Sequence, residues 1–259
     1  MKNRLFFASA LSIIGVLIII WFIISLIPTD LNPKFAVSIS KASKIGDFVG
    51  GFVGALFTLS GILLVYETLN LQRVEFSESQ KIFIRQQFES TFFQMLNTHN
   101  NIVNAIDIRS ENRNSKGEIV DSIIIFTSRD CFRHFYKQFK NEFRNPPKFD
   151  KDYVLSKYNV FYDKWEADLG HYFRHLYQIL KYIDLYGPKE FKDKKIYTNI
   201  LRATMSSNEL LLLFYNALSK NGNEKFKPLL ENYSFFNNIP LDKVIADEHL
   251  KFYDPKAFA

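Results

Sequence analysis

The sequence predicts an all-α protein in which two N-terminal membrane-spanning helices lead into a cytosolic helical bundle. Three observations predict this class. The first is a pair of long stretches without any charged residue, 5–27 and 48–66. The second is the absence of Gly and Pro from Ile62 to Lys116, which favours one long helix. The third is a set of aromatic residues at helical spacing, framed by helix-start and helix-stop signals.

The average composition conceals this division. The chain has 259 residues, of which 47% are hydrophobic and 23% charged, as in a soluble protein of one or two domains. With 10 Gly, 8 Pro and 1 Cys, the composition excludes a disordered chain, a collagen-like repeat and a disulfide scaffold. The apolar residues are concentrated near the N-terminus, which a soluble protein does not explain.

Residues 5–27 and about 45–66 are each long enough to cross a bilayer core of about 30 Å as a helix. The first stretch follows Lys2 and Arg4 and has no small-residue cleavage site after it, so it resembles an uncleaved signal anchor. The external loop 28–44 is too short to hold a domain. We therefore expect a transmembrane hairpin in contact with lipid over 1–66, and a cytosolic α-helical domain over 67–259.

The distribution of Lys and Arg predicts the orientation. Five basic residues flank the helices on one side and three on the other: Lys2, Arg4, Arg73, Lys81 and Arg85 against Lys34, Lys41 and Lys44. Because cytoplasmic flanks carry the excess of basic residues, both termini are expected in the cytoplasm. The single Cys131 agrees with a reducing compartment.

Glycines recur every four residues in the second membrane segment, at Gly46, Gly50 and Gly54. This spacing places them on one helix face, where another backbone can approach closely. Two interpretations stay open at this stage. The face packs on the first membrane helix of the same chain, or it joins several chains into a homo-oligomer.

The long helix predicted after the membrane carries a core-facing stripe: Phe88, Phe92, Met95, His99, Ile102 and Ile106. His99 is expected to be a hydrogen-bonded core residue rather than a ligand. The polar run 110–117 is expected to end this helix as a loop.

Further helices are expected downstream. Thr127 and Asp130 form a capping-box pattern that opens a helix to about Arg144, with Phe132, Phe135, Phe139 and Phe143 facing the core. Another helix is expected from Trp165 to Tyr186, stopped by Gly187 and Pro188. Ser206 and Glu209 frame a third start, before the all-apolar Leu210–Phe214, and Asn221-Gly222 ends this helix. The segment Ile119–Phe126 fits a strand or a helix.

Common catalytic motifs are absent from the sequence. It contains no P-loop, dinucleotide-binding, zinc-protease, serine-hydrolase or Cys-x-x-Cys motif. This absence disfavours an enzyme of those classes, and no cofactor is expected.

Arg129 and His134 match the loose Arg-(polar)-x-x-x-His pattern of HEPN-type ribonucleases, in which the two side chains polarise the scissile phosphate and move its proton. Five residues rotate about 140° around an ideal helix, so the two side chains should diverge unless a kink or a dimer brings them together. The competing interpretation is a solvated basic helix face.

A second polar constellation consists of Asp168, His171, Arg174 and His175. The spacing of Asp168, His171 and His175 places them together on a helix, opposite its apolar face. Zinc would need a further ligand that the sequence does not supply, so we expect an interaction surface and no metal. The competing interpretation is a plain solvated helix face. The net charge of +6 comes from basic runs interrupted by acidic residues, which disfavours a nucleic-acid groove.

Several blocks together resemble the AbiC-type phage abortive infection protein family: Phe48–Gly54, Arg85–Val103, Ser128–Phe132, Leu169–Asp184, Asn199–Ser219 and Lys225–Phe236. The resemblance implies a bacterial membrane-anchored protein that defends against phage by stopping or killing the infected cell. Together with the two apolar stretches, this predicts a multi-pass protein of the bacterial inner membrane. It transfers no catalytic residue. The expected partner is a phage component or another defence protein.

Three mechanisms fit this role. In the first, the domain senses infection and the hairpin serves as anchor or perturbs the membrane. In the second, the domain is a tethered ribonuclease. In the third, it is a non-enzymatic scaffold or receptor that recruits another effector.

Overall fold

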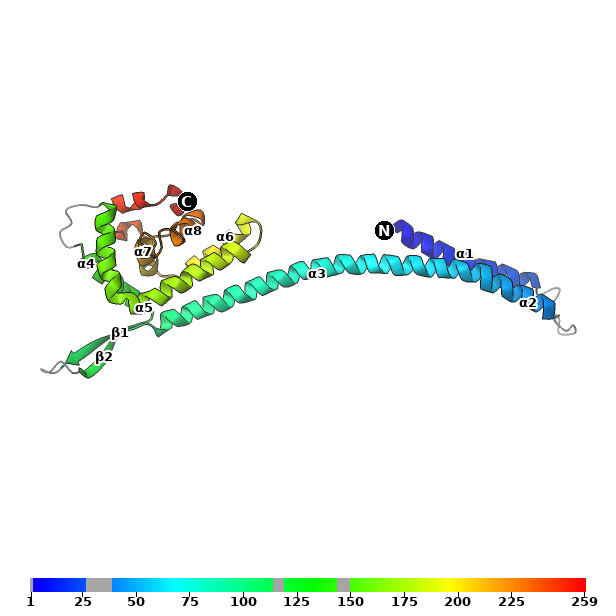
Figure 1. The fold of residues 1–259 in the computed structure, drawn as a ribbon, viewed down its shortest axis with the longest axis horizontal. Helices are drawn as coiled ribbons and strands as arrows, with labels where there is room; N and C mark the ends of the chain where they lie inside the picture. The colour runs from blue at the N-terminus through cyan, green and yellow to red at the C-terminus, as the bar shows by residue number, and fades with distance from the viewer. Residues whose placement is uncertain (1, 27–38, 114–118, 144–149) are drawn as a thin grey trace. The chain divides into compact units, whose positions relative to one another are not determined.

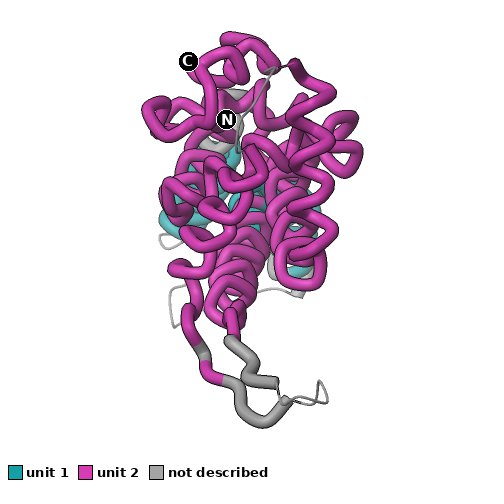
Figure 2. The backbone as a smooth tube through the Cα atoms, turned by 90° about the vertical axis from the view of Figure 1, so that its left-hand side faces the viewer, with its two compact units in different colours: residues 1–84 teal, residues 85–259 magenta. Residues whose placement is uncertain are grey.

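The computed structural model describes residues 2–26, 39–113, 119–143 and 150–259, and these are predominantly helical (Figure 1). The all-α prediction is therefore confirmed for most of the chain. The chain forms two compact units, residues 1–84 and 85–259 (Figure 2). The membrane boundary expected after residue 66 stays a prediction.

Unit 1 begins with helix α1 (Lys2–Leu26), close to the expected 5–27. Helix α2 (Ile39–Phe48) begins inside the expected external loop, because Ser, Lys and Ala at 40–44 do not break a helix. Residues 28–38 of that loop lie outside the described residues. A π-helical turn, Val49–Val53, continues α2 directly into helix α3 (Gly54–Ala105).

Two helical segments, Phe6–Ile24 and Gly46–Ala105, contain windows long and apolar enough to cross a membrane. Their large apolar side chains are mostly exposed within the described chain, and Trp21 is 67% exposed.

Small residues mediate the contact between α1 and α3 within unit 1. The Ser60 hydroxyl donates to the carbonyl oxygen of Ala8 (2.7 Å) and lies 2.6 Å from the Ser12 hydroxyl. A Cβ placed on Gly15 would lie 3.2 Å from Cζ of Phe57, so glycine lets this ring approach the α1 backbone.

The stripe predicted on the second half of α3 faces the core of unit 2. Phe88, Phe92, His99 and Ile106 are buried, while Met95 and Ile102 are partly buried against the same core. Ile106 follows the last residue of α3 and continues the stripe. This prediction is confirmed.

Strand β1 (Asp107–Arg113) corrects the loop expected over 110–117. It pairs antiparallel with β2 (Ile119–Thr127), with Asp107 opposite Thr127, so the ambiguous segment 119–126 is a strand. The isoleucines of β2 favour extended backbone, and pairing supplies hydrogen bonds to the backbone of the polar β1. Residues 114–118 lie outside the described chain.

Helix α4 (Arg129–Asn141) has its N-cap one residue after the predicted cap at Thr127. Ser128 is the N-cap, with φ of 53° and no side-chain cap bond, so the capping box of Thr127 and Asp130 is wrong. The backbone N–H of Ser128 donates to the carbonyl oxygen of Ile106 (2.8 Å), and its hydroxyl to Oδ1 of Asn104 (2.9 Å). The chain thus enters α4 by bonding to the end of α3. The four predicted core phenylalanines, 132, 135, 139 and 143, are buried.

Helix α5 (Lys151–Tyr186) is longer than predicted. Asp150 caps it, accepting a bond from the backbone N–H of Tyr153 (2.7 Å), while Trp165, the expected start, lies at a kink (φ −117°, ψ 18°). The predicted stop at Gly187 is confirmed. A Cβ there would lie 2.3 Å from the carbonyl oxygen of Ile183, so only glycine fits.

The remaining helices are α6 (Phe191–Ala203), α7 (Ser207–Asn216) and α8 (Phe226–Asn232), followed by 3₁₀ turns at Leu241–Lys243, Asp247–Phe252 and Pro255–Phe258. The predicted capping box of Ser206 and Glu209 is present at the start of α7. Residues Leu210–Phe214 are buried, as expected, although α7 ends before Asn221-Gly222.

Aromatic rings join α7 to its neighbours α4 and α5. The ring of Phe139 lies 4.8 Å from that of Tyr215, 5.5 Å from Tyr158 and 5.3 Å from Phe161, measured between centroids. Such tilted and edge-to-face pairs each add about 0.5–1.5 kcal/mol beyond the area they bury. The centre of unit 2 is therefore a rigid aromatic core on which polar side chains can be positioned.

Candidate functional site

A carboxylate buried in this core, that of Glu209, organises the most connected polar cluster of unit 2. Glu209 is the third residue of α7 and is 0% exposed. Its Oε1 accepts from the backbone N–H of Ser206 (3.1 Å) and from the Ser206 hydroxyl (2.8 Å). Its Oε2 accepts from the hydroxyl of Tyr172 on α5 (3.0 Å). A buried charge needs such donors to offset its lost hydration.

Arg129, the first residue of α4, supplies the opposite charge. Its Nη1 lies 3.6 Å from Oε1 of Glu209. The guanidinium also donates to the carbonyl oxygen of Thr204, which follows α6, and to Oδ1 of Asn100 on α3 (3.3 Å). One cation therefore joins four helical segments around a buried anion. With 43% of its side chain exposed, Arg129 also contacts solvent.

Two histidines lie on the other side of Tyr172. The His99 ring is 4.9 Å from the ring of Tyr172 and stacks on His175 at 5.7 Å, with 13° between the planes. His99 is 1% exposed. Among the described residues, neither nitrogen of His99 nor Nδ1 of His175 has a hydrogen-bond partner. The prediction of a core His99 is thus confirmed, but its predicted hydrogen bond is not formed.

Burial keeps this histidine pair neutral near pH 7. It lowers the pKa of His99 to about 4, with smaller contributions from His175 and Arg129, and it also lowers the pKa of His175. A neutral imidazole with unpartnered nitrogens can still accept one proton or ligate a metal. Yet the described residues contain no group of three His, Cys, Asp or Glu arranged to hold a metal ion.

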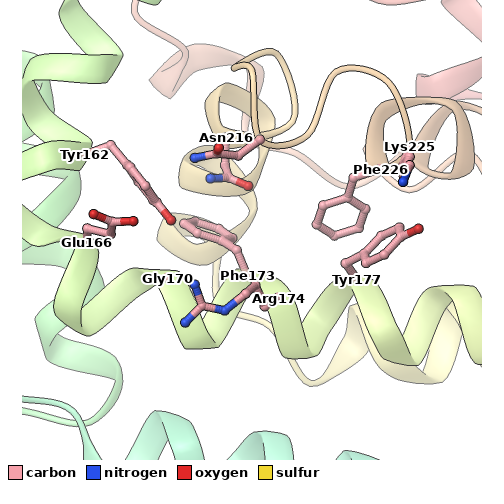
Figure 3. Close-up of a pocket in the computed structure, with 10 residues that line it drawn as sticks. Tyr162, Glu166, Gly170, Phe173, Arg174, Tyr177, Asn216, Lys225 and Phe226 are labelled. Carbon is pink, nitrogen blue, oxygen red and sulfur yellow. The ribbon is translucent and has the colours of Figure 1, made fainter.

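The predicted interaction surface on α5 divides into separate environments. His171 is exposed, with Nδ1 3.1 Å from the carbonyl oxygen of Ala167, and Asp168 beside it is half-buried, which raises the pKa of its carboxyl. His175 turns toward His99 on α3. Arg174 lines a pocket on another side of the helix (Figure 3). Successive α-helical positions differ by about 100°, which explains the division.

Arg129 and His134 contact different parts of the domain. The His134 ring lies 5.1 Å from Phe126 and 6.0 Å from Trp165, and its Nε2 is 3.3 Å from Nε2 of Gln138. None of these residues contacts Arg129 among the described interactions. The two side chains diverge from α4, as the five-residue spacing predicts.

The glycine series of unit 1 does not mediate the observed contact with α1. A Cβ on Gly46 or Gly50 would meet no atom within 4 Å, and one on Gly54 would meet only the carbonyl oxygen of Val49, at 3.8 Å. Within the described chain this face is open.

Sequence reasoning missed Tyr172 and the role of Glu209 in this cluster. Tyr172 lies on the buried, apolar face of α5, where only its terminal hydroxyl is polar, and the sequence pattern identifies Glu209 only as part of a helix cap. A carboxylate directly before the fully apolar Leu210–Phe214 was the available signal, because such a group must be buried with its partners.

The low pKa of His99 predicts a pH-dependent stability. The unfolded state binds a proton near pH 6.5 and the folded state only near pH 4, so stability is lost as the pH falls through this window. Replacing the titrating ring by an apolar one, His99→Phe, should make the melting temperature of the detergent-solubilised chain fall less between pH 7.5 and pH 5. His134, His175 and His249, whose pKa values are also lowered, leave a residual dependence. An unchanged pH dependence in this variant contradicts the assignment.

Comparison with known proteins gives one match. Residues 164–244 match a family model described as putative phage abortive infection protein. No curated protein and no solved structure matches the chain. The matched segment includes Tyr172, His175 and Glu209, whereas His99 and Arg129 lie outside it. The resemblance to the AbiC-type phage abortive infection family is thereby confirmed over residues 164–244.

Proposed function

We propose that the protein is a membrane-anchored bacterial defence protein whose cytosolic domain senses phage infection and whose N-terminal helices anchor it or perturb the membrane. The observation that carries this proposal is the family match over residues 164–244. That segment covers most of α5, all of α6, α7 and α8, and one wall of the buried Glu209 cluster.

The exposed apolar helices of unit 1 support the membrane part of the proposal. A water-soluble surface rarely carries so many large apolar side chains together. Phe6, Leu17 and Trp21 on α1, with Ile62 and Val65 on α3, are all exposed. Lipid would cover them. The basic flanks favour cytoplasmic termini in the inner membrane.

The open glycine face supports self-association as the way in which the hairpin acts on the membrane. Contacts between α1 and α3 use Ser12, Gly15 and Ser60 and leave Gly46, Gly50 and Gly54 free. Small residues at four-residue spacing allow close helix–helix approach in lipid. A second copy of the chain is therefore the partner proposed for this face.

The double substitution Gly50→Leu and Gly54→Leu tests this mechanism. Since a Cβ on Gly50 would meet no atom within 4 Å and one on Gly54 only the Val49 carbonyl oxygen at 3.8 Å, an ordinary contact, the described fold of one chain should tolerate the change. We expect the wild type to depolarise infected cells. The variant should insert normally into the membrane but lose both phage protection in plaque assays and this depolarisation.

Ile62→Leu, at an exposed apolar position of the same helix, is the matched control and should protect fully. Full protection by the glycine variant contradicts a role for this face. Full protection by a chain that lacks residues 1–66 contradicts any role for the membrane.

The tethered ribonuclease is the second candidate, and the structure changes how it must be tested. Arg129 pairs with a buried carboxylate, so Arg129→Ala alters the core whether or not the residue is catalytic. His134→Ala is the informative variant, with Lys140→Ala, an exposed residue of the same helix, as the control. A ribonuclease mechanism predicts loss of RNA cleavage and protection in His134→Ala alone. Unchanged phage resistance in this variant removes the ribonuclease hypothesis.

The scaffold or receptor alternative relies on the exposed part of the α5 surface, at Asp168 and His171. It also remains a proposal. Its partner would be another defence protein or a phage component.

A further inference from the structure

A pocket of about 260 Å³ lies beside α5, on the C-terminal side of the kink at Trp165 (Figure 3). The end of α7 and the start of α8 complete its wall. Of the ten residues that line it, all but Tyr162 fall within the family-matched segment 164–244. The pocket belongs entirely to unit 2 and is separate from the Glu209 cluster.

Polar groups converge at one end of the pocket. A Cβ on Gly170 would lie 3.3 Å from both the Tyr162 hydroxyl and Nη1 of Arg174, so these two groups come together over the bare backbone of a glycine. Lys225 lines the opposite end of the pocket, beside Phe226, from the segment that leads into α8 (Figure 3). Among the described residues, the Tyr162 hydroxyl, Arg174 and Lys225 make no hydrogen bond or ion pair. These three groups are therefore available to bind a ligand.

The charge of the lining favours an anion. Two cations, Arg174 and Lys225, and one carboxylate, Glu166, line the pocket; Arg174 and Glu166 lie at one end and Lys225 at the other. A guanidinium donates two parallel hydrogen bonds to a phosphate or carboxylate, and an ammonium adds a second positive charge.

Aromatic rings form the other end of the pocket. Tyr177 and Phe226 meet edge to face, with 5.5 Å between their centroids and 70° between their planes. Between the two ends, Asn216 donates its Nδ2 to the Tyr158 hydroxyl (2.9 Å). This bond fixes the amide, and its Oδ1 stays available to accept from a ligand.

We propose that this pocket binds a nucleoside monophosphate. Arg174 and the Tyr162 hydroxyl hold the phosphate, Tyr177 and Phe226 contact the planar base with Lys225 beside them, and Asn216 accepts from its polar edge. The volume is near the lower end of the range for ligand pockets, about 300–1,000 Å³, which favours a mononucleotide over a larger nucleotide. The proposal does not depend on phage defence, since binding is measured without infection.

Thermal unfolding of the full chain in detergent tests the proposal, because a ligand that binds only the folded state raises the melting temperature. The probes are AMP, GMP, CMP and UMP. Adenosine, which lacks the phosphate, and inorganic phosphate, which lacks the nucleoside, are tested as partial ligands. We expect at least one nucleoside monophosphate to raise the melting temperature, and adenosine or inorganic phosphate alone to raise it less at equal concentration.

Two variants connect the binding to this pocket. Arg174→Gln removes the proposed phosphate contact and Tyr177→Leu the proposed base contact, and each should weaken binding at least about tenfold. Arg133→Gln removes an exposed cation of α4 outside the pocket and should bind as wild type does.

Three results overturn the proposal. They are no stabilisation by any of the four nucleotides, equal binding of nucleotide by wild type and Arg174→Gln, and equal stabilisation by inorganic phosphate alone.

Discussion

The buried carboxylate of Glu209 is the constraint on which the architecture of unit 2 depends. A fully buried anion at the centre of an aromatic core is costly unless donors and a cation surround it. Here the donors come from Ser206 and from Tyr172 on α5, and the cation is Arg129 on α4. Through Asn100 and the Thr204 carbonyl, the same cation also fixes α3 and the end of α6. The positions of α3, α4, α5, α7 and the end of α6 thus all depend on satisfying one charge.

This constraint also determines which residues are free to act. Arg129 pairs with the buried Glu209. This structural role explains an arginine at this position of the ribonuclease-like pattern without any catalytic function. Tyr172 is held by Glu209, and its ring in turn positions His99, whose nitrogens stay unpartnered among the described residues. Arg174 and Lys225 make no hydrogen bond or ion pair among the described residues, and they line a pocket within the family-matched segment. We therefore propose that ligand binding by this domain occurs at that pocket.

Periodicity and capping chemistry predicted most helices, because the stripe on α3, the phenylalanines of α4 and the Ser206 cap are local signals. The β1–β2 hairpin was missed because β1 is a polar segment that becomes a strand only through its pairing with β2. The start of α5 was missed because Trp165 marks a kink and not an end. In the site, the sequence motifs single out Arg129 and His175. Their partners, Glu209 and His99, lie on helices far away in the sequence, and residue spacing cannot predict contacts between such distant segments.

The central claim is that Arg129 and Glu209 stabilise the domain as a pair, and a double-mutant cycle measures this directly. The variants are Arg129→Met, Glu209→Gln and their combination, compared by the free energy of unfolding of the full chain in detergent. The account predicts that Arg129→Met alone is strongly destabilising and that Glu209→Gln partly rescues it, with a coupling of about 0.5–3 kcal/mol. Additive effects of the two substitutions, with no coupling, would contradict it.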